Sequence, residues 1–384
     1  MKKIWVIGLA LQLCSIGGFV ITLRPALSAS APAESEGKRL LQKLIEAARK
    51  EGQMDLMIVS SVGEKGAKEL VDAFKKRFGL NITMNADLSG QESQKFNQAV
   101  AETKAGIPPT FDLMEGPVEV ILSLKDAGGT VPVENWETLL AEIAPEAYKV
   151  RDRVSPSILA GYVFLWSTRT TANLYNTNAI SERELPRTWK DMGNPKYRGA
   201  FSVPPWTTIP LLGLLKYDKD EWLEVVRAMG RNKRDVLTYD AGTQRVLLGD
   251  LKFTFGNADT YFEHKERDPK APIGLSFFED LTTIRPTFYV ARNGAKHPNA
   301  AKLFELWAAG GEASEIFEKY GHLENQVLAR GPISQKVAET LKARNIKALS
   351  WFDSPQTLEK FRWLETKEGK DYSRAIATAQ REGK

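Results

Sequence analysis

Cysteine and histidine are scarce in this chain of 384 residues, which holds one cysteine and three histidines. The cysteine, Cys14, lies in an apolar N-terminal stretch, so the chain after that stretch can form no disulfide and offers no thiol nucleophile. His264, His297 and His322 are far apart in the sequence and lack the spacing of zinc ligands. We therefore expect neither a resident metal nor another cofactor.

Long hydrophobic runs and the common catalytic motifs are also missing. After the N-terminal stretch, no segment stays apolar for the roughly 20 residues that a membrane helix needs. The sequence has no G-x-S-x-G elbow, no H-E-x-x-H helix and no G-x-x-x-x-G-K-[ST] phosphate loop. Glu279 and Asp280 form an adjacent acid pair, but such pairs in loops are usually solvated. We expect no enzymatic activity, and an exported hydrolase is the less favoured alternative.

Charge of one sign is not in large excess. The formal charge is +5, and removal of Lys2, Lys3 and Arg24, with no acid before Ser28, leaves +2. Charges of both signs are interspersed, and no basic stripe alternates with aromatic residues. The sequence therefore favours neither nucleic acid nor an anionic membrane surface as a partner. An apolar content of 42% over this length is enough for two ordinary hydrophobic cores.

The N-terminus has the organisation of a secretory signal. Lys2 and Lys3 precede an apolar run over 4–23, and small residues follow over 26–31. This order is that of a charged n-region, an apolar core and a cleavage region. The residue before Cys14 is a leucine rather than a small residue, so we expect no lipid anchor. An uncleaved anchor helix is the alternative.

Apolar periodicity after this signal alternates between amphipathic helices and short buried strands. The first strand, helix and second strand form a unit that builds parallel sheet with a right-handed crossover. In such open α/β sheets, ligands bind beyond the carboxyl ends of the strands, where Ser60, Ser61 and Glu115 lie. The serines could equally cap the helix that follows. The expected strands are 54–59, 80–84, 111–114, 200–203, 251–255 and 287–291.

Three segments in this order resemble a known family. EGQMDLMIVSS with ELVDAFKKRFGLNI resembles the first strand and helix of the periplasmic binding proteins of the ferric-iron, polyamine and phosphonate cluster. The segments 188–206 and 286–307 are similar to later parts of these proteins, at the expected spacing. The resemblance implies a type II fold of class α/β, with two lobes that are each a mostly parallel sheet flanked by helices. Two crossing strands, near 164–170 and 283–291, would form the hinge.

The resemblance also implies a domain plan and a ligand cleft between the lobes. Lobe 1 would comprise 36–168 and return as 287–384 with the C-terminal helices, and lobe 2 would comprise 169–286. Trp166 and Arg169 would lie close to the hinge. The expected ligand contacts are Ser60, Ser61, Glu115, Trp166, Arg169, Trp206, Thr207, Thr208, Tyr239, Asp240, Asn257 and Tyr261.

The resemblance implies a function but leaves the ligand open. We expect an exported, monomeric protein that captures a small ligand and delivers it to the permease of an ABC-type importer. A ligand-sensing partner of a membrane receptor is the alternative. Ferric-binding members use an adjacent tyrosine pair, which this sequence lacks, so tight binding of iron(III) is not expected.

The chemistry of the expected contacts favours a small organic anion over a cationic amine. Thr207 and Thr208 precede a helix, whose free N–H groups and partial positive charge attract anions. Trp206 offers a flat face to an organic body. Glu115 and Asp240 would instead suit an amine, which is the alternative ligand class.

The signal assignment predicts export and shortening of the chain near Ser28, so that residues 1–28 are removed. Intact-mass measurement of the protein recovered from the periplasm checks this prediction. A mass that still includes residues 1–25 would contradict it.

Overall fold

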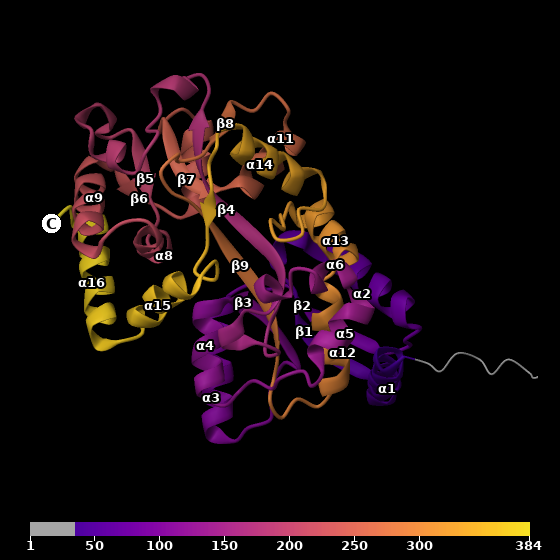
Figure 1. The fold of residues 1–384 in the computed structure, drawn as a ribbon. Coiled ribbons are helices and arrows are strands. Elements are labelled where there is room, and N and C mark those ends of the chain that lie inside the picture. Colours follow the sequence, from indigo (N-terminus) through magenta and orange to yellow (C-terminus); the bar gives the residue numbers. More distant parts are fainter. Residues whose placement is uncertain (1–34) are drawn as a thin grey trace, which may run out of the picture. The chain divides into compact units, whose positions relative to one another are not determined.

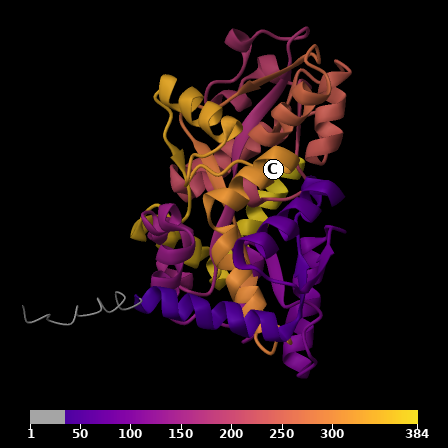
Figure 2. The same cartoon turned by 90° about the vertical axis from the view of Figure 1, so that its right-hand side faces the viewer.

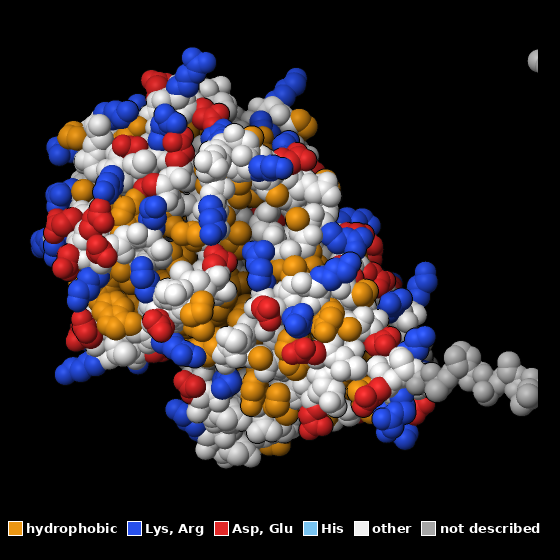
Figure 3. All heavy atoms as spheres, in the orientation of Figure 1, with side chains coloured by type: hydrophobic (Ala, Val, Ile, Leu, Met, Phe, Trp, Pro, Cys, Tyr) orange, Lys and Arg blue, Asp and Glu red, His pale blue; other side chains and the backbone are white. Residues whose placement is uncertain are grey.

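The computed structural model describes residues 35–384, with the side chains of Thr208 and Ile209 excepted. The predicted signal peptide lies outside the described residues. No helix within 35–384 is long and apolar enough to cross a membrane. Basic and acidic side chains are interspersed over the face drawn in Figure 3, in agreement with the mixed charge pattern of the sequence.

Ten strands of the described chain form one sheet that is antiparallel in the middle and parallel towards both ends. The strand order is β2-β1-β3-β9-β4-β7-β5-β6, with β10 paired to β9 and β8 paired to β4. The strands are β1 Gln53–Met57, β2 Thr83–Asp87, β3 Leu113–Pro117, β4 Phe164–Asn176, β5 Phe201–Val203, β6 Asp235–Val236, β7 Phe253–Asn257, β8 Ile273–Ser276, β9 Thr282–Ala291 and β10 Ala348–Leu349.

Helices surround both ends of this sheet (Figure 1). The N-terminal helices are α1 Glu36–Glu51, α2 Gly63–Phe78, α3 Glu92–Ala105, α4 Val118–Asp126, α5 Trp136–Ile143, α6 Pro145–Tyr148 and α7 Arg151–Val154. The helices of the middle section are α8 Thr208–Leu212, α9 Lys219–Asn232, α10 Tyr239–Leu247 and α11 Ala258–Arg267. The C-terminal helices are α12 Pro298–Ala308, α13 Gly311–Gly321, α14 Pro332–Ala343, α15 Pro355–Leu364 and α16 Lys367–Glu382.

The long strands β4 and β9 join two lobes, as Figures 1 and 2 show. We call the part around β1–β3 the first lobe and the part around β5–β8 the second lobe. β9 pairs with β3 at one end and with β4 along its length, and β4 continues to β7 in the second lobe. The expected α/β class and the crossing strands near 164–170 and 283–291 are confirmed.

Strand β2 begins three residues later than the periodicity predicted. Leu80 and Ile82 are buried, which produced the strand-like pattern. The Leu80 amide, however, donates to the carbonyl of Lys75 and so completes the C-terminal cap of α2. Pairing with β1 therefore starts only at Thr83.

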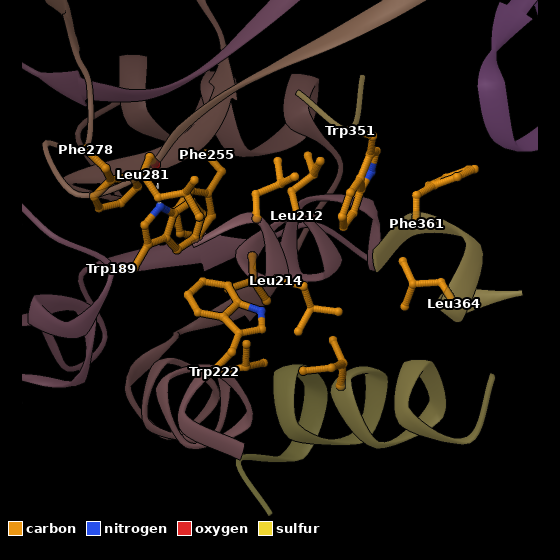
Figure 4. Close-up of a cluster of buried hydrophobic side chains, with 14 of the residues drawn as sticks. Trp189, Leu212, Leu214, Trp222, Phe255, Phe278, Leu281, Trp351, Phe361 and Leu364 are labelled. Carbon is orange, nitrogen blue, oxygen red and sulfur yellow. Dashed lines mark hydrogen bonds between the residues drawn. The ribbon is translucent and has the colours of Figure 1, made fainter. Parts of the chain in front are cut away.

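Aromatic clusters form the cores of the two lobes. In the first lobe, Phe74 lies 5.0 Å from Phe304 and 5.5 Å from Trp307, measured between ring centroids. In the second lobe, Trp189 stacks on Phe278 at 4.3 Å and contacts Trp222 edge-on at 5.5 Å (Figure 4). Each cluster anchors the helices that cover its part of the sheet.

The C-terminal helices depart from the expected domain plan. Helices α12 and α13 pack on the first lobe, against α1 and α2, as the segment 287–384 was expected to do. Helix α16 instead packs along α9 of the second lobe, and α14 contacts α11. Trp351, Phe361 and Leu364 pack with core residues of the second lobe such as Leu212 and Leu214 (Figure 4). The predicted boundaries at 168 and 286 stay predictions.

A buried ion pair closes the first lobe next to β9. Arg292 is 1% exposed, and its guanidinium lies 3.3 Å from a carboxylate oxygen of Glu102 in α3. Its Nε and Nη2 atoms also donate to the carbonyls of Gly129 and Ala99, both at 3.2 Å. One side chain thus connects the end of β9 with α3 and with the loop after α4.

We expect Arg292→Met to lower the free energy of unfolding by about 3–5 kcal/mol, because it leaves the buried Glu102 without its cation. Arg267→Met is the matched control. Arg267 pairs with Glu263 at 2.5 Å on an exposed face, so its loss should cost at most about 0.5 kcal/mol. Urea denaturation measures both variants. A loss of similar size in the two would contradict the assignment.

Candidate functional site

Two arginines face each other on the crossing strands. In the antiparallel pairing of β4 with β9, Arg169 is directly opposite Arg285. Side chains in such cross-strand positions lie on the same face, with Cβ atoms about 5 Å apart. Like charges in this position repel each other and destabilise the sheet unless an anion lies between them. Both arginines are partly exposed, whereas most of their neighbours along the two strands are buried.

The two arginines differ in how they are neutralised. Arg169 pairs with Asp259, in the first turn of α11, at 3.5 Å. The backbone of Arg285 pairs with β4, but its side chain forms no ion pair or hydrogen bond with any described residue. Its charge acts at longer range on the carboxyl group of Glu119. Burial raises the pKa of that group, and the positive charge of Arg285 opposes the rise. The site therefore holds a guanidinium without a close counterion.

Trp206 and Tyr239 form an aromatic corner near the two arginines. The Trp206 Nε1 atom donates to the Tyr239 hydroxyl at 3.3 Å, and the rings are perpendicular with centroids 4.8 Å apart. Burial raises the pKa of Tyr239, while the charges of Arg285 and Arg169 oppose that rise. The Tyr239 hydroxyl is therefore within electrostatic range of both arginines. We call Arg169, Arg285, Trp206, Tyr239 and Asp259 the arginine site.

The first lobe contributes a buried carboxyl group from β3. Glu115 is 2% exposed, and its Oε2 atom has no hydrogen-bond partner among the described residues. Burial raises the pKa of Glu115 to about 8, with a further rise from Glu92, and the charges of Arg169 and Lys95 oppose it. Glu115 is therefore largely protonated at neutral pH. A neutral carboxyl group can donate a hydrogen bond and does not neutralise the arginines.

The predicted serines lie at the end of β1, in the one-turn helix Ser60–Val62. Both are exposed. The N-cap of α2 is Val62, so the serines do not cap that helix. Ser61 lies beside the C-terminus of α13, since a Cβ on Gly321 would stand 3.1 Å from the Ser61 hydroxyl. The serines thus face outward from the first lobe's strand ends, the position predicted for them.

One predicted contact lies in the hydrophobic core, and a second is partly buried against a smaller apolar cluster. Trp166 is 1% exposed and packs on Phe317 at 4.3 Å and on Tyr289 at 5.6 Å. Tyr261 packs around Leu174. Because side chains alternate along β4, that is the face opposite Arg169. Burial of large aromatic surface explains the position of Trp166.

The remaining predicted residues lie around the second lobe's strand ends. Thr207 is the N-cap residue of α8 and its side chain makes no capping bond. The side chain of Thr208 lies outside the described part of the chain. Asn257 is buried at the end of β7, and Asp240 is exposed in the first turn of α10. None of these has a contact that ties it to the arginine pair.

Sequence reasoning missed Arg285 and Asp259. Arg285 lies one residue before Pro286, inside an apolar stretch taken only as a hinge strand. Asp259 follows the predicted strand end at 255 by four residues, two after Asn257, and nothing in the sequence linked it to Arg169. The register of β4 with β9 was the missing information, because only that register sets the two arginines opposite each other.

One cluster outside this site has metal-ligand chemistry. Atoms of Asp55, Asp112 and His297 lie within 4.8 Å of one another. The Asp112 carboxylate already accepts the backbone amides of Asp55 at 2.8 Å and of His297 at 3.0 Å, and it contacts the His297 Nδ1 atom at 2.7 Å. These bonds tie β1 and β3 to the start of α12. The cluster is a structural clasp of the first lobe.

Comparison with known proteins adds the wider context. Residues 69–343 match the model of a family described as bacterial extracellular solute-binding protein. The Fe(3+)-binding periplasmic protein of Serratia marcescens is 24% identical over 294 residues, which span 71% of this chain and 78% of that protein.

Solved structures share the fold at low sequence identity. A Trichodesmium protein (IdiA, FutA), in complex with iron and citrate ligands, has 20% identity and a TM-score of 0.61, covering 87% of this chain and 100% of that one. The periplasmic binding protein AfuA from Actinobacillus pleuropneumoniae, with fructose-6-phosphate bound, has 14% identity and a TM-score of 0.60, covering 82% and 98%. These likenesses show the two-lobed type II fold.

The raised pKa of Glu115 predicts a pH dependence of stability. In the unfolded chain this carboxyl titrates near the ordinary value of 4.5, and in the folded chain near 8. The folded state therefore holds the proton more tightly, so this stabilisation is complete below about pH 4.5 and is lost as the pH rises through about 8.

Glu115→Gln keeps a neutral side chain of similar shape. From pH 5 to 9, the free energy of unfolding of the parent should fall relative to this variant by about 2–4 kcal/mol. Parallel pH profiles in urea denaturation would contradict the prediction.

Proposed function

The chain belongs to the bacterial extracellular solute-binding protein family, and we propose that it captures a small organic anion between its lobes for delivery to an ABC-type importer. Capture takes place outside the cytoplasm. The permease is the partner that receives the liganded protein.

The observation that carries the proposal is the guanidinium of Arg285, which has no close counterion and stands opposite Arg169. Asp259 can balance only one of these two positive charges. A planar guanidinium binds a carboxylate or phosphate group through two parallel hydrogen bonds. An anion between the strands would thus relieve the repulsion and satisfy the free donors together.

The neighbouring groups support the same charge preference. Glu115, which would suit an amine if ionised, is held largely protonated by its raised pKa of about 8. Trp206 and Tyr239 offer aromatic surface for the organic part of a ligand. The exposed serines of the first lobe, Ser60 and Ser61, and the free hydroxyl of Thr207 are further donors. A cationic amine would meet two arginines and one carboxylate already in use.

The mechanism is closure of the lobes around the ligand. A ligand that contacts both lobes favours the closed arrangement, because only there are both sets of contacts formed. The hinge is the β4–β9 pair, which bends between the lobes.

Ferric iron is a second candidate, favoured by the iron-binding relative from Serratia marcescens. Among residues of the arginine site, only Asp259 and Tyr239 could supply an anionic oxygen, and burial raises the tyrosine pKa. Two guanidinium groups also repel a bare Fe(III) ion. We therefore expect bare iron to bind weakly, while an iron–citrate complex would enter as an anion.

The test is a thermal-shift and calorimetric comparison of citrate, inorganic phosphate, putrescine and Fe(III) on the mature protein. We expect an anion of this set to bind, and Arg285→Gln to weaken it by at least tenfold through loss of charge-assisted hydrogen bonds of about 1.5–3 kcal/mol. Arg267→Gln, on an exposed helix face, is the matched control and should bind as the parent does.

Binding of putrescine alone, or unchanged anion affinity in the Arg285→Gln variant, would overturn the assignment of an anion. A tight, coloured complex with bare Fe(III) would favour the second candidate instead.

A further inference from the structure

The loop that carries Trp206 is held by the far end of the chain. Gln380, in the last turn of α16, donates its Nε2 group to the carbonyls of Pro204 at 2.5 Å and of Trp206 at 3.2 Å. Arg381 donates to the carbonyl of Pro205 at 3.2 Å. Three successive carbonyl groups of the loop therefore receive hydrogen bonds from two adjacent side chains of α16.

The loop cannot provide these bonds itself. Strand β5 ends at Val203, and Pro204 and Pro205 have no backbone N–H with which to continue a strand ladder. Without donors from elsewhere, the three carbonyls would turn to water and the loop would be free to adopt other conformations. The donors come from a helix that is itself firmly seated.

Helix α16 is fixed to the second lobe along most of its length. Ile376 and Ala379 are fully buried in the core. The contact with α9 is so close that a Cβ on Gly230 would stand 2.1 Å from the carbonyl oxygen of Ala379. Lys233 also donates to the carbonyl of Arg381 at 2.5 Å. The helix is thus a rigid support for the loop.

The buried position of Gln380 is energetically unfavourable for its side-chain amide. Its side chain is 1% exposed, and its Oε1 atom has no partner among the described residues. Burying a half-satisfied amide is unfavourable, and a methionine of similar shape would pack without that cost. The amide's contribution is therefore the geometry it imposes on the loop.

We propose that α16 fixes the loop 204–207 in its ligand-binding conformation, with Gln380 as the positioning residue for Trp206. The contact continues from Trp206 to Tyr239 and so to the arginine site. This inference rests on the proposed function, which assigns Trp206 to the ligand. Helix α16 lies beyond residues 69–343, the segment that matches the family model. The second-lobe wall of the site is thus shaped from outside that segment.

Hydrogen exchange on the mature full-length protein tests the positioning role without any ligand. Gln380→Met removes both donated bonds and keeps the side-chain volume. Loss of one protecting bond typically corresponds to about a tenfold change. We expect the amide of Leu211, which donates to the carbonyl of Thr207 at the end of the loop, to exchange about tenfold faster, with no change in α9. Thr378→Ala is the matched control, because that hydroxyl on the same helix bonds only to the carbonyl of Arg374. Unchanged exchange of the Leu211 amide in the Gln380→Met variant would overturn the proposal.

Arg381→Met provides a second variant in case Gln380→Met does not fold. Arg381 is exposed, and its loss removes only the bond to Pro205. Exchange of the Leu211 amide should again rise, by a smaller factor. No change in this variant would contradict the support of the loop by α16.

A double-mutant cycle with citrate as the probe separates positioning from general stability. Gln380→Met should weaken citrate binding about tenfold in the parent and not at all in a Trp206→Ala background. The fall in melting temperature should be the same in both backgrounds. Equal loss of affinity in both would contradict a role through Trp206. If citrate does not bind the parent, the ligand proposal is at fault, and the exchange experiment alone decides the role of Gln380.

Discussion

The antiparallel pairing of β4 with β9 is the interaction on which the rest of the structure depends. These two strands are the only sheet connection between the lobes in the described chain, since β9 pairs with β3 on one side and β4 pairs with β7 on the other. Their register sets Arg169 opposite Arg285. A shift by one residue would send every side chain of one strand to the opposite face. The hinge and the charge of the site therefore have a single structural origin.

A second contact keeps this hinge strand in place. The Glu324 carboxylate, in the segment after α13, accepts the backbone amide of Thr170, and the Glu324 carbonyl accepts the amide of Thr168 at 2.8 Å. Burial raises the pKa of Glu324 to about 7, and its bond to Thr170 opposes that rise. The segment after α13 thus supports β4 on the side away from β9. Arg169 is thus held by strand pairing on one edge of β4 and by hydrogen bonds to Glu324 on the other.

Much of the fold could be predicted from the sequence, because strands such as 54–59 and 251–255 are short apolar runs bounded by turn residues. The loop position of Ser60 and Ser61 after the first strand followed from this pattern, whereas Glu115, expected in a loop, lies inside β3. Other features depend on long-range contacts that no local pattern carries. The burial of Trp166, the seat of α16 on α9 and the partner of Arg169 are examples. A polar residue at a strand end indicates a site, but register and packing decide which side chains meet there.

Because the arginines lie on the hinge, the groups that attract the ligand differ from the groups that favour closure of the lobes. Because Arg169 and Arg285 lie on paired strands, they stay neighbours whether the lobes are open or closed. Their attraction for an anion is therefore similar in both arrangements. A contact that is equally strong in the open and the closed state does not change the equilibrium between them. In the proposed function, the arginines supply the initial capture. Closure is then driven by groups that approach only when the lobes meet, for which we propose the first-lobe donors Ser60 and Ser61 and the protonated Glu115. On the second lobe, Trp206 can complement these groups only if its loop is already in place. A loop that is rigid before binding does not have to be ordered by the ligand, so none of the free energy of the ligand contacts is lost to ordering the chain.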